Sequence, residues 1–308
     1  MQIHRTLISA LAAAATAAIA HLVFSAAAAY TMASYDKRIF DVRRFPDARD
    51  YPALIGGYLV SRGTSGKTVV AGSSFSFGYP FAADLAPAAL MDHEPMNASI
   101  IGLGLQGVRS IVLCEMRARR LRASHLVVEV PLINEIAALK VYNKPSRGCT
   151  ESSSGHPTLL RYAIGNPIGL HWAEILTDPY RRATQSAFVS VASVADDYFA
   201  SAEQFASVKA ELYARMADTY SIAKEVSDEA YLFVTPVYIP GVMQAGRDAE
   251  NVRQQFDFAQ SACIDIAGER CIQTQSMLDG AVYYSNLTHL GAAGARELAR
   301  LTEMTMRR

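Results

Sequence analysis

The stretch TVVAGSSFSFGYP, residues Thr68 to Pro80, holds the first clues to the fold. Apolar residues run into a glycine and two adjacent serines, which alternating aromatic and small residues follow. This pattern is typical of a buried strand that ends in a sharp turn before a helix. A serine at such a turn can serve as a nucleophile, because the unpaired amides of the helix N-terminus lie beside it. Small residues after a strand also form ordinary turns, so the stretch alone leaves both interpretations open.

Apolar runs elsewhere predict further strands, and amphipathic segments between them predict helices. The predicted strands are 67–73, 97–104, 124–133, 229–239 and 261–268, and the predicted helices are 108–121, 202–226 and 291–306. Strands that alternate with helices imply right-handed crossovers between parallel strands. The predicted fold class is therefore α/β, a three-layer α/β/α sandwich around a mostly parallel central sheet.

One connection is too long for a crossover helix. Almost a hundred residues separate Asn134 from Tyr231, and they begin with a loop rich in glycine, proline and serine. We expect a helical insertion at about 143–227 within an α/β domain of residues 36–308, with helices at 170–175 and 185–199. Ligands of open α/β sheets bind at the carboxyl ends of the strands. The insertion either shapes a pocket there or merely decorates the domain.

The N-terminal segment, residues 1–35, differs from the rest. No charged side chain lies between Arg5 and Asp36, and roughly 20 apolar residues suffice to cross a bilayer. The alanine-rich sequence before Tyr30 also fits a signal-peptidase site. The segment is interpreted as a membrane anchor or a cleaved signal, with a buried alanine-rich helix as a third reading. Basic residues concentrate after the segment, opposite to the positive-inside expectation for an exported C-terminal part.

Composition excludes some classes of partner and site. Basic and acidic residues both total 29, so the chain lacks the basic footprint of nucleic-acid binding. The four cysteines show no CxxC spacing, and we predict no metal and no cofactor. Cys114 and Cys263 lie in apolar runs and are predicted to be core thiols. Cys149 and Cys271 lie in loop-like sequence, which makes them the candidate disulfide of an exported domain.

The C-terminal stretch NLTHLGAAGA, residues 286–295, adds a histidine just before a glycine-containing turn and a final helix. Together with Gly72–Ser74 it resembles the SGNH or GDSL-type hydrolases and acyltransferases, whose first block is Gly-Asp-Ser and whose last block is Asp-x-x-His. The resemblance implies a flavodoxin-like fold, Ser74 as nucleophile and His289 as base, with Asn286 in the position of the triad acid. The Gly-Ser-Ser and SFSFG variants are similar to the D-alanyl-transfer and alginate-acetylation branches.

The resemblance also implies an oxyanion hole. The family has a glycine after its second strand and an asparagine at the end of its third strand. Gly104 and Gly107 are the candidates for the first, and Gly107 fits better because it lies next to the predicted helix start. Asn134 has the position of the second. Their backbone and side-chain N–H groups, with the Ser74 amide, would bind the developing oxyanion.

Two residues depart from the family pattern. Ser73 replaces an aspartate that is not the nucleophile, whereas Asn286 replaces the triad aspartate itself. An amide oxygen can hold a histidine tautomer but carries no charge to stabilise the imidazolium. Three interpretations stay open: Ser74 and His289 act as a dyad, another carboxylate such as Asp279 substitutes, or the site is impaired. Glu129 is a further oddity, since a carboxylate in an apolar strand needs a partner that the sequence does not identify.

The resemblance implies an exported, serine-dependent O-acyltransferase on the periplasmic side of the inner membrane, tethered there by the N-terminal segment. Its substrate would be an acyl ester or the O-acyl groups of cell-surface or extracellular polysaccharide, and its partner a membrane-bound O-acyltransferase. One alternative is a secreted carbohydrate or lipid esterase. The other is a catalytically impaired scaffold of the same fold that binds a glycan or a membrane partner.

Overall fold

The structure is a computed structural model that describes residues 9, 11–20, 23, 55, 56, 59, 60, 62–78, 85–92, 95–100, 102–141, 149 and 199–308. Residues 11–20 of the N-terminal segment are helical. Within these ranges, no helix combines the length and the apolar character needed to span a bilayer. Most of the N-terminal segment lies outside the described residues, so membrane anchoring stays a prediction.

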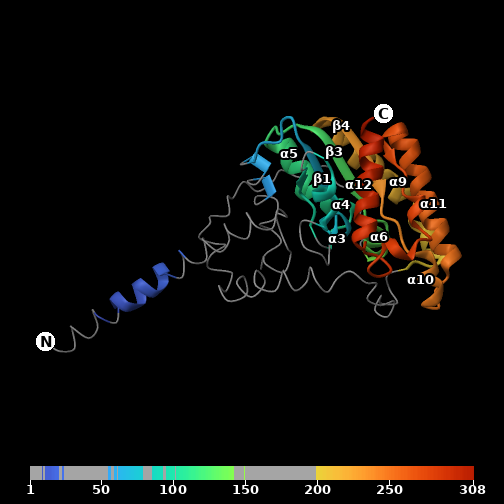
Figure 1. Ribbon diagram of the computed structural model, residues 1–308, viewed down its shortest axis with the longest axis horizontal. Coiled ribbons are helices and arrows are strands. Elements are labelled where there is room, and N and C mark those ends of the chain that lie inside the picture. Colours follow the sequence, from blue (N-terminus) through green and yellow to red (C-terminus); the bar gives the residue numbers. More distant parts are fainter. Residues whose placement is uncertain are drawn as a thin grey trace.

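In the described part of the chain, five parallel strands form one sheet (Figure 1). Their order across the sheet is β2 (Met96–Asn97), β1 (Thr68–Ala71), β3 (Ala123–Val130), β4 (Ser227–Val234) and β5 (Cys271–Ile272). This is the 2-1-3-4-5 order of flavodoxin-like doubly wound sheets. The predicted α/β class with a parallel central sheet is therefore confirmed for the described part of the chain.

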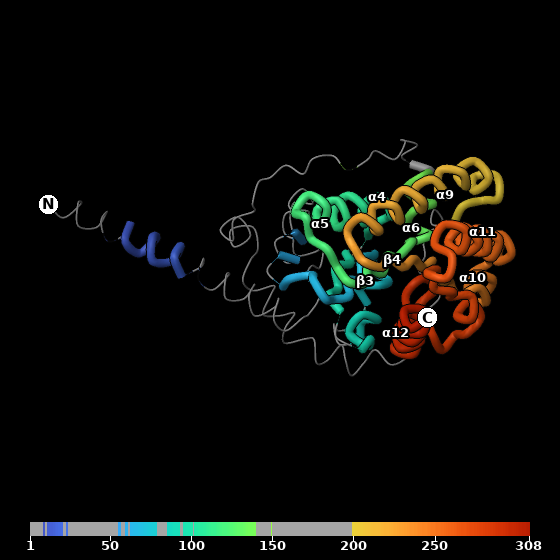
Figure 2. Tube along the Cα trace, turned by 90° about the horizontal axis from the view of Figure 1, so that it is seen from above, coloured from blue at the N-terminus to red at the C-terminus, as the bar shows by residue number. Residues whose placement is uncertain are grey.

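Helices cover both faces of the sheet (Figure 2). Alternate strand residues enter two separate cores: Val69 and Val128 belong to one, and Val70 and Val127 to the other. The first core is closed by α4 (Leu105–Val108), the π-helical η5 (Arg109–Leu113), α5 (Cys114–Ala118), α9 (Ala202–Glu225) and α11 (Ala249–Ala267). The second core is closed by α3 (Ser74–Phe77) and α12 (Ala292–Met306). The result is the predicted three-layer arrangement.

The predicted helices are confirmed with small shifts at their ends. The segment predicted at 108–121 is the continuous helical run of α4, η5 and α5, and the segment at 291–306 is α12. Helix α9 begins at a capping box in which the Ser201 side chain accepts from the Gln204 amide and the Gln204 side chain accepts from the Ser201 amide. It occupies the C-terminal part of the predicted insertion and packs against α11 and β4. The rest of that insertion, including the helices predicted before Phe199, lies outside the described residues.

Four strand predictions are wrong in their extent. The strand predicted at 97–104 is only Met96–Asn97, and the strand predicted at 229–239 is Ser227–Val234. Residues 261–267 of the last predicted strand belong to helix α11, because Val252, Phe256, Ala259 and Cys263 are buried at helical spacing. The last strand is instead Cys271–Ile272. Strand β3 ends at Val130 rather than Ile133 because Pro131 offers no N–H for the ladder, and helix α6 (Leu132–Val141) starts directly after it.

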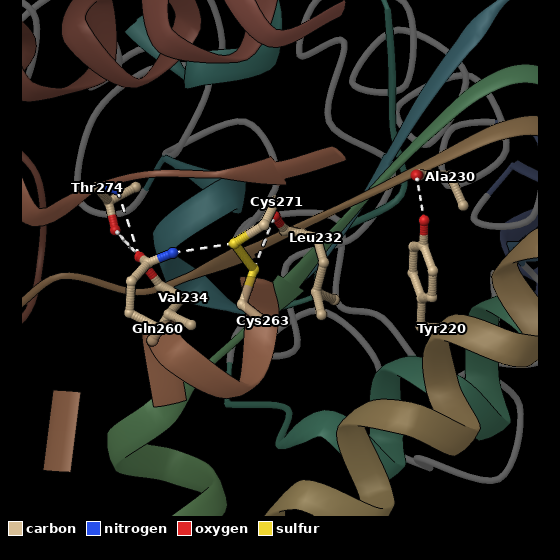
Figure 3. Close-up of a disulfide and its surroundings, with 8 residues drawn as sticks. All are labelled: Tyr220, Ala230, Leu232, Val234, Gln260, Cys263, Cys271 and Thr274. Carbon is tan, nitrogen blue, oxygen red and sulfur yellow. Dashed lines mark hydrogen bonds between the residues drawn. A yellow bond between two sulfur atoms is a disulfide. The ribbon is translucent and has the colours of Figure 1, made fainter. Parts of the chain in front are cut away.

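The predicted Cys149–Cys271 disulfide is also wrong. Cys114 pairs with Cys149, and Cys263 pairs with Cys271, with Cα–Cα distances of 5.4 and 5.6 Å. Cys263 lies in the last turns of α11, and the chain reverses at Gly268–Arg270 so that Cys271 comes back beside it (Figure 3). Gln260 donates to the Cys271 sulfur at 2.9 Å. The cysteines in apolar runs are thus half-cystines rather than free core thiols.

Candidate active site

The turn after β1 presents Ser74 at the carboxyl end of the sheet. Ser73 is the N-cap of α3, Ser74 is its first residue, and Gly78 ends the helix in the left-handed conformation with φ 84°. Gly72 is required for a different reason, which is close approach. A Cβ at this position would lie 2.3 Å from the Glu129 Oε2 atom.

A short closed loop presents His289. Tyr284 and Leu290 form an antiparallel bridge, and the Ser285 amide donates to the His289 carbonyl at 2.9 Å. The Gly291 amide donates to the Tyr283 carbonyl at 2.7 Å, directly before α12 begins. Backbone bonds on both sides therefore fix the histidine between the sheet edge and the last helix.

The structure brings Ser74, His289 and Asn286 into one line. Ser74 Oγ lies 3.0 Å from His289 Nε2, and His289 Nδ1 lies 3.1 Å from Asn286 Oδ1. The same Oδ1 accepts the backbone N–H groups of Thr288 and His289, both at 2.9 Å. Because only the amide oxygen can accept these bonds, the oxygen and not the nitrogen faces the ring. Nδ1 then carries the proton, and the Nε2 lone pair faces the serine hydroxyl.

Of Ser74, His289 and Asn286, only His289 can gain a charge by taking up a proton near physiological pH. Burial lowers the pKa of His289 from 6.5 to about 4, so the ring is neutral at pH 7. Asp279 does not fill the place of the missing acid, because it forms an ion pair with Arg253 at 2.6 Å and its side chain is 64% exposed. Asn286 Oδ1 and the Thr288 hydroxyl, at 3.1 and 3.2 Å, lie on the Nδ1 side. These two groups can hold a tautomer, but neither is a carboxylate that would stabilise an imidazolium.

Glu129 finds its partners in the serine turn. Its side chain is fully buried and accepts the backbone N–H of Ser73 at 2.9 Å and of Ser76 at 3.0 Å. The Ser73 hydroxyl also hydrogen-bonds to it. Burial raises the pKa of this carboxyl, and the hydrogen bonds oppose that effect. The buried carboxyl of Glu129, which had no evident partner in the sequence, thus directly supports the turn that carries Ser74.

The second and third strands place Gly104 beside the start of α6. Gly104 is the N-cap of α4, and a Cβ there would lie 2.8 Å from Glu135 Oε2. Asn134 lies in the first turn of α6 and donates from Nδ2 to the Leu103 carbonyl at 3.4 Å. Gly107 lies inside α4 with its Cα facing the Leu103 side chain. The glycine next to Asn134 is therefore Gly104, the candidate that the sequence ranked second.

A buried ion pair, absent from the sequence prediction, holds this side of the site. Glu135 accepts the Leu105 amide at 2.6 Å and the Arg215 guanidinium at 2.7 Å, and both side chains are almost wholly buried. Arg215 also contacts Glu211 at 2.8 Å. The only sequence signal was an arginine on the apolar face of a long amphipathic helix.

Comparisons with known proteins leave the family open. No family model matches the chain, and no curated protein matches it. Among solved structures, the chain is similar to YxiM of Bacillus subtilis at 13% sequence identity and a TM-score of 0.35. The match covers 80% of this chain and 57% of YxiM. A likeness this distant carries no argument about function, so the proposals below rest on the geometry of the site.

Proposed function

We propose that this chain is a serine-dependent acyl-transfer enzyme of the SGNH type. The observation that carries the proposal is the alignment of Ser74 Oγ, His289 Nε2 and Asn286 Oδ1, each within hydrogen-bond distance of the next. Nucleophile, base and orienting group in this geometry are the requirements of covalent acyl transfer. The parallel sheet adds support, because the serine turn lies at the carboxyl end of β1, where ligands of such sheets bind.

The proposed reaction has two steps. Ser74 Oγ attacks the carbonyl carbon of an ester while its proton moves to His289 Nε2, and the imidazolium then protonates the departing alcohol. In the second step an acceptor hydroxyl gives its proton to Nε2 and attacks the acyl carbonyl carbon, and the imidazolium returns the proton to Ser74 Oγ as the serine leaves. Water as acceptor gives hydrolysis, and a sugar hydroxyl gives transfer.

The oxyanion would be bound by backbone and side-chain N–H groups around Ser74. Within the described part of the chain, no acceptor occupies the Ser74 amide, which lies at the start of α3. The Asn134 side chain and the glycine after the second strand supply the other donors in this proposal. Gly104 is favoured over Gly107, because it adjoins the Asn134 segment.

We further propose that the acyl groups belong to cell-surface or extracellular polysaccharide and that the chain works outside the cytoplasm beside a membrane-bound O-acyltransferase. Two disulfides support an oxidising compartment. The uncharged segment between Arg5 and Asp36 supports membrane tethering, and the likeness of the serine block to polysaccharide-modifying branches supports the substrate class.

An acyl-transfer assay tests the proposal. Purified chain is given p-nitrophenyl acetate, and the Ser74 peptide is analysed by mass spectrometry for an acetyl adduct, with Ser74→Ala as control. A soluble polysaccharide is then added as acceptor. Faster p-nitrophenol release with acetyl on the glycan supports a transferase, whereas fast release without glycan stimulation supports a secreted esterase. The absence of an adduct in folded wild type contradicts both.

One observation favours a second candidate, a catalytically impaired scaffold that binds a glycan or a membrane partner. Asn286 provides no charge, and the pKa of His289 of about 4 makes the ring a weak base. Asn286→Asp discriminates between the two functions. A strong gain in acyl turnover shows that the rest of the site is competent, whereas no gain together with no labelling by a serine-reactive probe supports the scaffold.

A further inference from the structure

We propose that Glu129 is a positioning residue that holds the nucleophile turn so that Ser74 Oγ points at His289. The inference rests on the proposed function, since it assigns Glu129 a part in the reactivity of Ser74. The argument starts from where the hydrogen bonds of this carboxyl go.

All the hydrogen bonds that the structure shows for the Glu129 carboxyl go to the residues around Ser74. Ser73 precedes the nucleophile and donates from both its amide and its hydroxyl, and Ser76 lies two residues beyond and donates its amide. The carboxyl therefore hydrogen-bonds to the turn on both sides of Ser74. Helix α3 has only four residues, so its own backbone bonds cannot fix the turn.

The position of Glu129 is costly unless it serves this turn. The side chain is fully buried on the central strand β3, and burial of a carboxyl is unfavourable without hydrogen bonds. The carboxyl also fills the space directly behind the turn. A Cβ at Gly72 would lie 2.3 Å from its Oε2 and 2.7 Å from Ser76 Oγ. The Glu129 side chain on the neighbouring strand thus fits against the turn only because position 72 is a glycine.

A second strand supports the same turn. Asn97 of β2 donates from Nδ2 to the Ser76 carbonyl at 3.1 Å, and this bond is buried. The turn is therefore held from β3 at its amides and from β2 at a carbonyl. Only the β3 contact reaches Ser73, the residue next to the nucleophile.

The hydroxyl of Ser73 makes the contact independent of the charge of Glu129. An ionised carboxylate accepts the Ser73 O–H, whereas a neutral carboxyl can donate its own O–H to Ser73 Oγ. Ser73 Oγ also accepts the Phe75 amide at 3.5 Å, as the side chain of an N-cap residue does. Glutamine at 129 would keep these contacts, because both amides share Oε2 and the NH₂ group could take the place of Oε1 and donate to Ser73 Oγ. Methionine is similar in size and offers no acceptor to the two amides.

The test compares Glu129→Met with Glu115→Met in the full-length chain. Glu115 is a matched control, because it is also buried and pairs with Arg119 at 3.0 Å on the neighbouring helix α5. Three quantities are measured for each: the rate of labelling by a fluorophosphonate probe, kcat and KM on p-nitrophenyl acetate, and amide hydrogen exchange of the peptide spanning 72–78. Thermal unfolding reports whether each variant is folded.

We expect Glu129→Met to lower the labelling rate and kcat roughly 10²-fold with a much smaller change in KM, because a misplaced nucleophile slows the chemical step. Exchange of 72–78 should become faster in this variant alone. Glu115→Met should lose thermal stability and keep both the labelling rate and the exchange pattern. Wild-type labelling and exchange in folded Glu129→Met overturn the proposal, and so does an equal loss of labelling in Glu115→Met.

Two further outcomes are also decisive. If Glu129→Met does not fold, Ser73→Ala replaces it, with slower labelling and faster 72–78 exchange as the supporting result and wild-type behaviour as the overturning one. If wild type does not label at all, the proposed function fails, and the role of Glu129 is tested by hydrogen exchange alone. Faster exchange of 72–78 only in Glu129→Met then supports its role in holding the turn, and unchanged exchange overturns it.

Discussion

Ser74 Oγ lies 3.0 Å from His289 Nε2, although 215 positions separate the two residues in the chain. The parallel sheet makes this contact possible. Ser74 follows the carboxyl end of β1. The bridge between Tyr284 and Leu290 closes the loop that holds His289 beside it. On its other side, the His289 ring contacts Asn286, whose position is occupied by an aspartate in the family that the sequence resembles.

Asn286→Asp is predicted to increase the labelling rate and to move its acid limb to higher pH. The base acts only when neutral, so the wild-type rate should fall as the pH drops through about 4. A carboxylate next to Nδ1 favours the imidazolium, and so it raises the pKa of His289 and stabilises the charge that forms during attack. We expect a gain of roughly 10²-fold or more, since loss of the equivalent carboxylate in a serine protease costs about 10⁴-fold.

The control is Asn286→Ala, which removes Oδ1, the nearer of the two oxygens within hydrogen-bond distance of His289 Nδ1. Its labelling rate should fall below that of wild type. A pH profile of labelling between pH 3.5 and about 8 records both variants. Equal rates for wild type, Asn286→Asp and Asn286→Ala would show that the Nδ1 partner has no role in the reactivity of Ser74.

His289 also predicts a pH dependence of stability. Its pKa is about 4 in the folded chain and 6.5 when unfolded, so the unfolded chain binds more protons between these values. The free energy of unfolding therefore has its full His289 contribution above pH 6.5. This contribution, at most roughly 3 kcal/mol, is lost as the pH falls to about 4. Urea unfolding of wild type and His289→Gln across this window measures it. The wild-type curve should fall more steeply, and parallel curves would refute the assignment.

The two disulfides should stabilise the fold by different amounts. They close loops with sequence separations of 8 for Cys263–Cys271 and 35 for Cys114–Cys149. Chain-entropy estimates give roughly 2–3 kcal/mol for the shorter loop and about 4 kcal/mol for the longer one. Urea unfolding with and without reductant measures each contribution in the paired alanine variants that retain the other disulfide. A wild-type stability that reductant leaves unchanged would contradict the pairing.

Arg215→Met should destabilise the chain by roughly 3–5 kcal/mol, because it leaves the buried Glu135 carboxylate without its partner. Adding Glu135→Gln should recover most of that loss. Arg117→Met is the matched control, since Arg117 pairs with Glu225 at 3.3 Å on the exposed surface, and its effect should stay below about 1 kcal/mol. Urea unfolding of wild type and the three variants gives the comparison. Equal losses at Arg215 and Arg117 would rule out a structural role for the buried pair.

The sequence predicted the elements that depend on local pattern. Apolar runs located β1, β3 and β4, and amphipathic spacing located α9 and α12. The segment at 261–268 was misread because a short apolar run can be either a strand or the buried face of a helix. This error also hid the Cys263–Cys271 disulfide, since it placed Cys263 in a strand rather than beside the chain reversal.

Tertiary contacts were the features that pattern could not reveal. The sequence marked Glu129 as a carboxyl in need of a partner, but the turn that satisfies it lies 53 to 56 positions away. Arg215 and Glu135 are 80 positions apart, and only the packing of α9 against α6 brings them together. The sequence favoured Gly107 over Gly104, because the difference between them depends on where α4 begins relative to Asn134.

Labelling of the full-length chain with a fluorophosphonate serine probe tests the central claim most directly. Wild type, Ser74→Ala and His289→Ala are compared at pH 7, each checked for folding by thermal unfolding. We predict that wild type labels, that Ser74→Ala does not, and that His289→Ala labels much more slowly. Folded wild type that does not label, or Ser74→Ala that labels as fast as wild type, would contradict an activated Ser74.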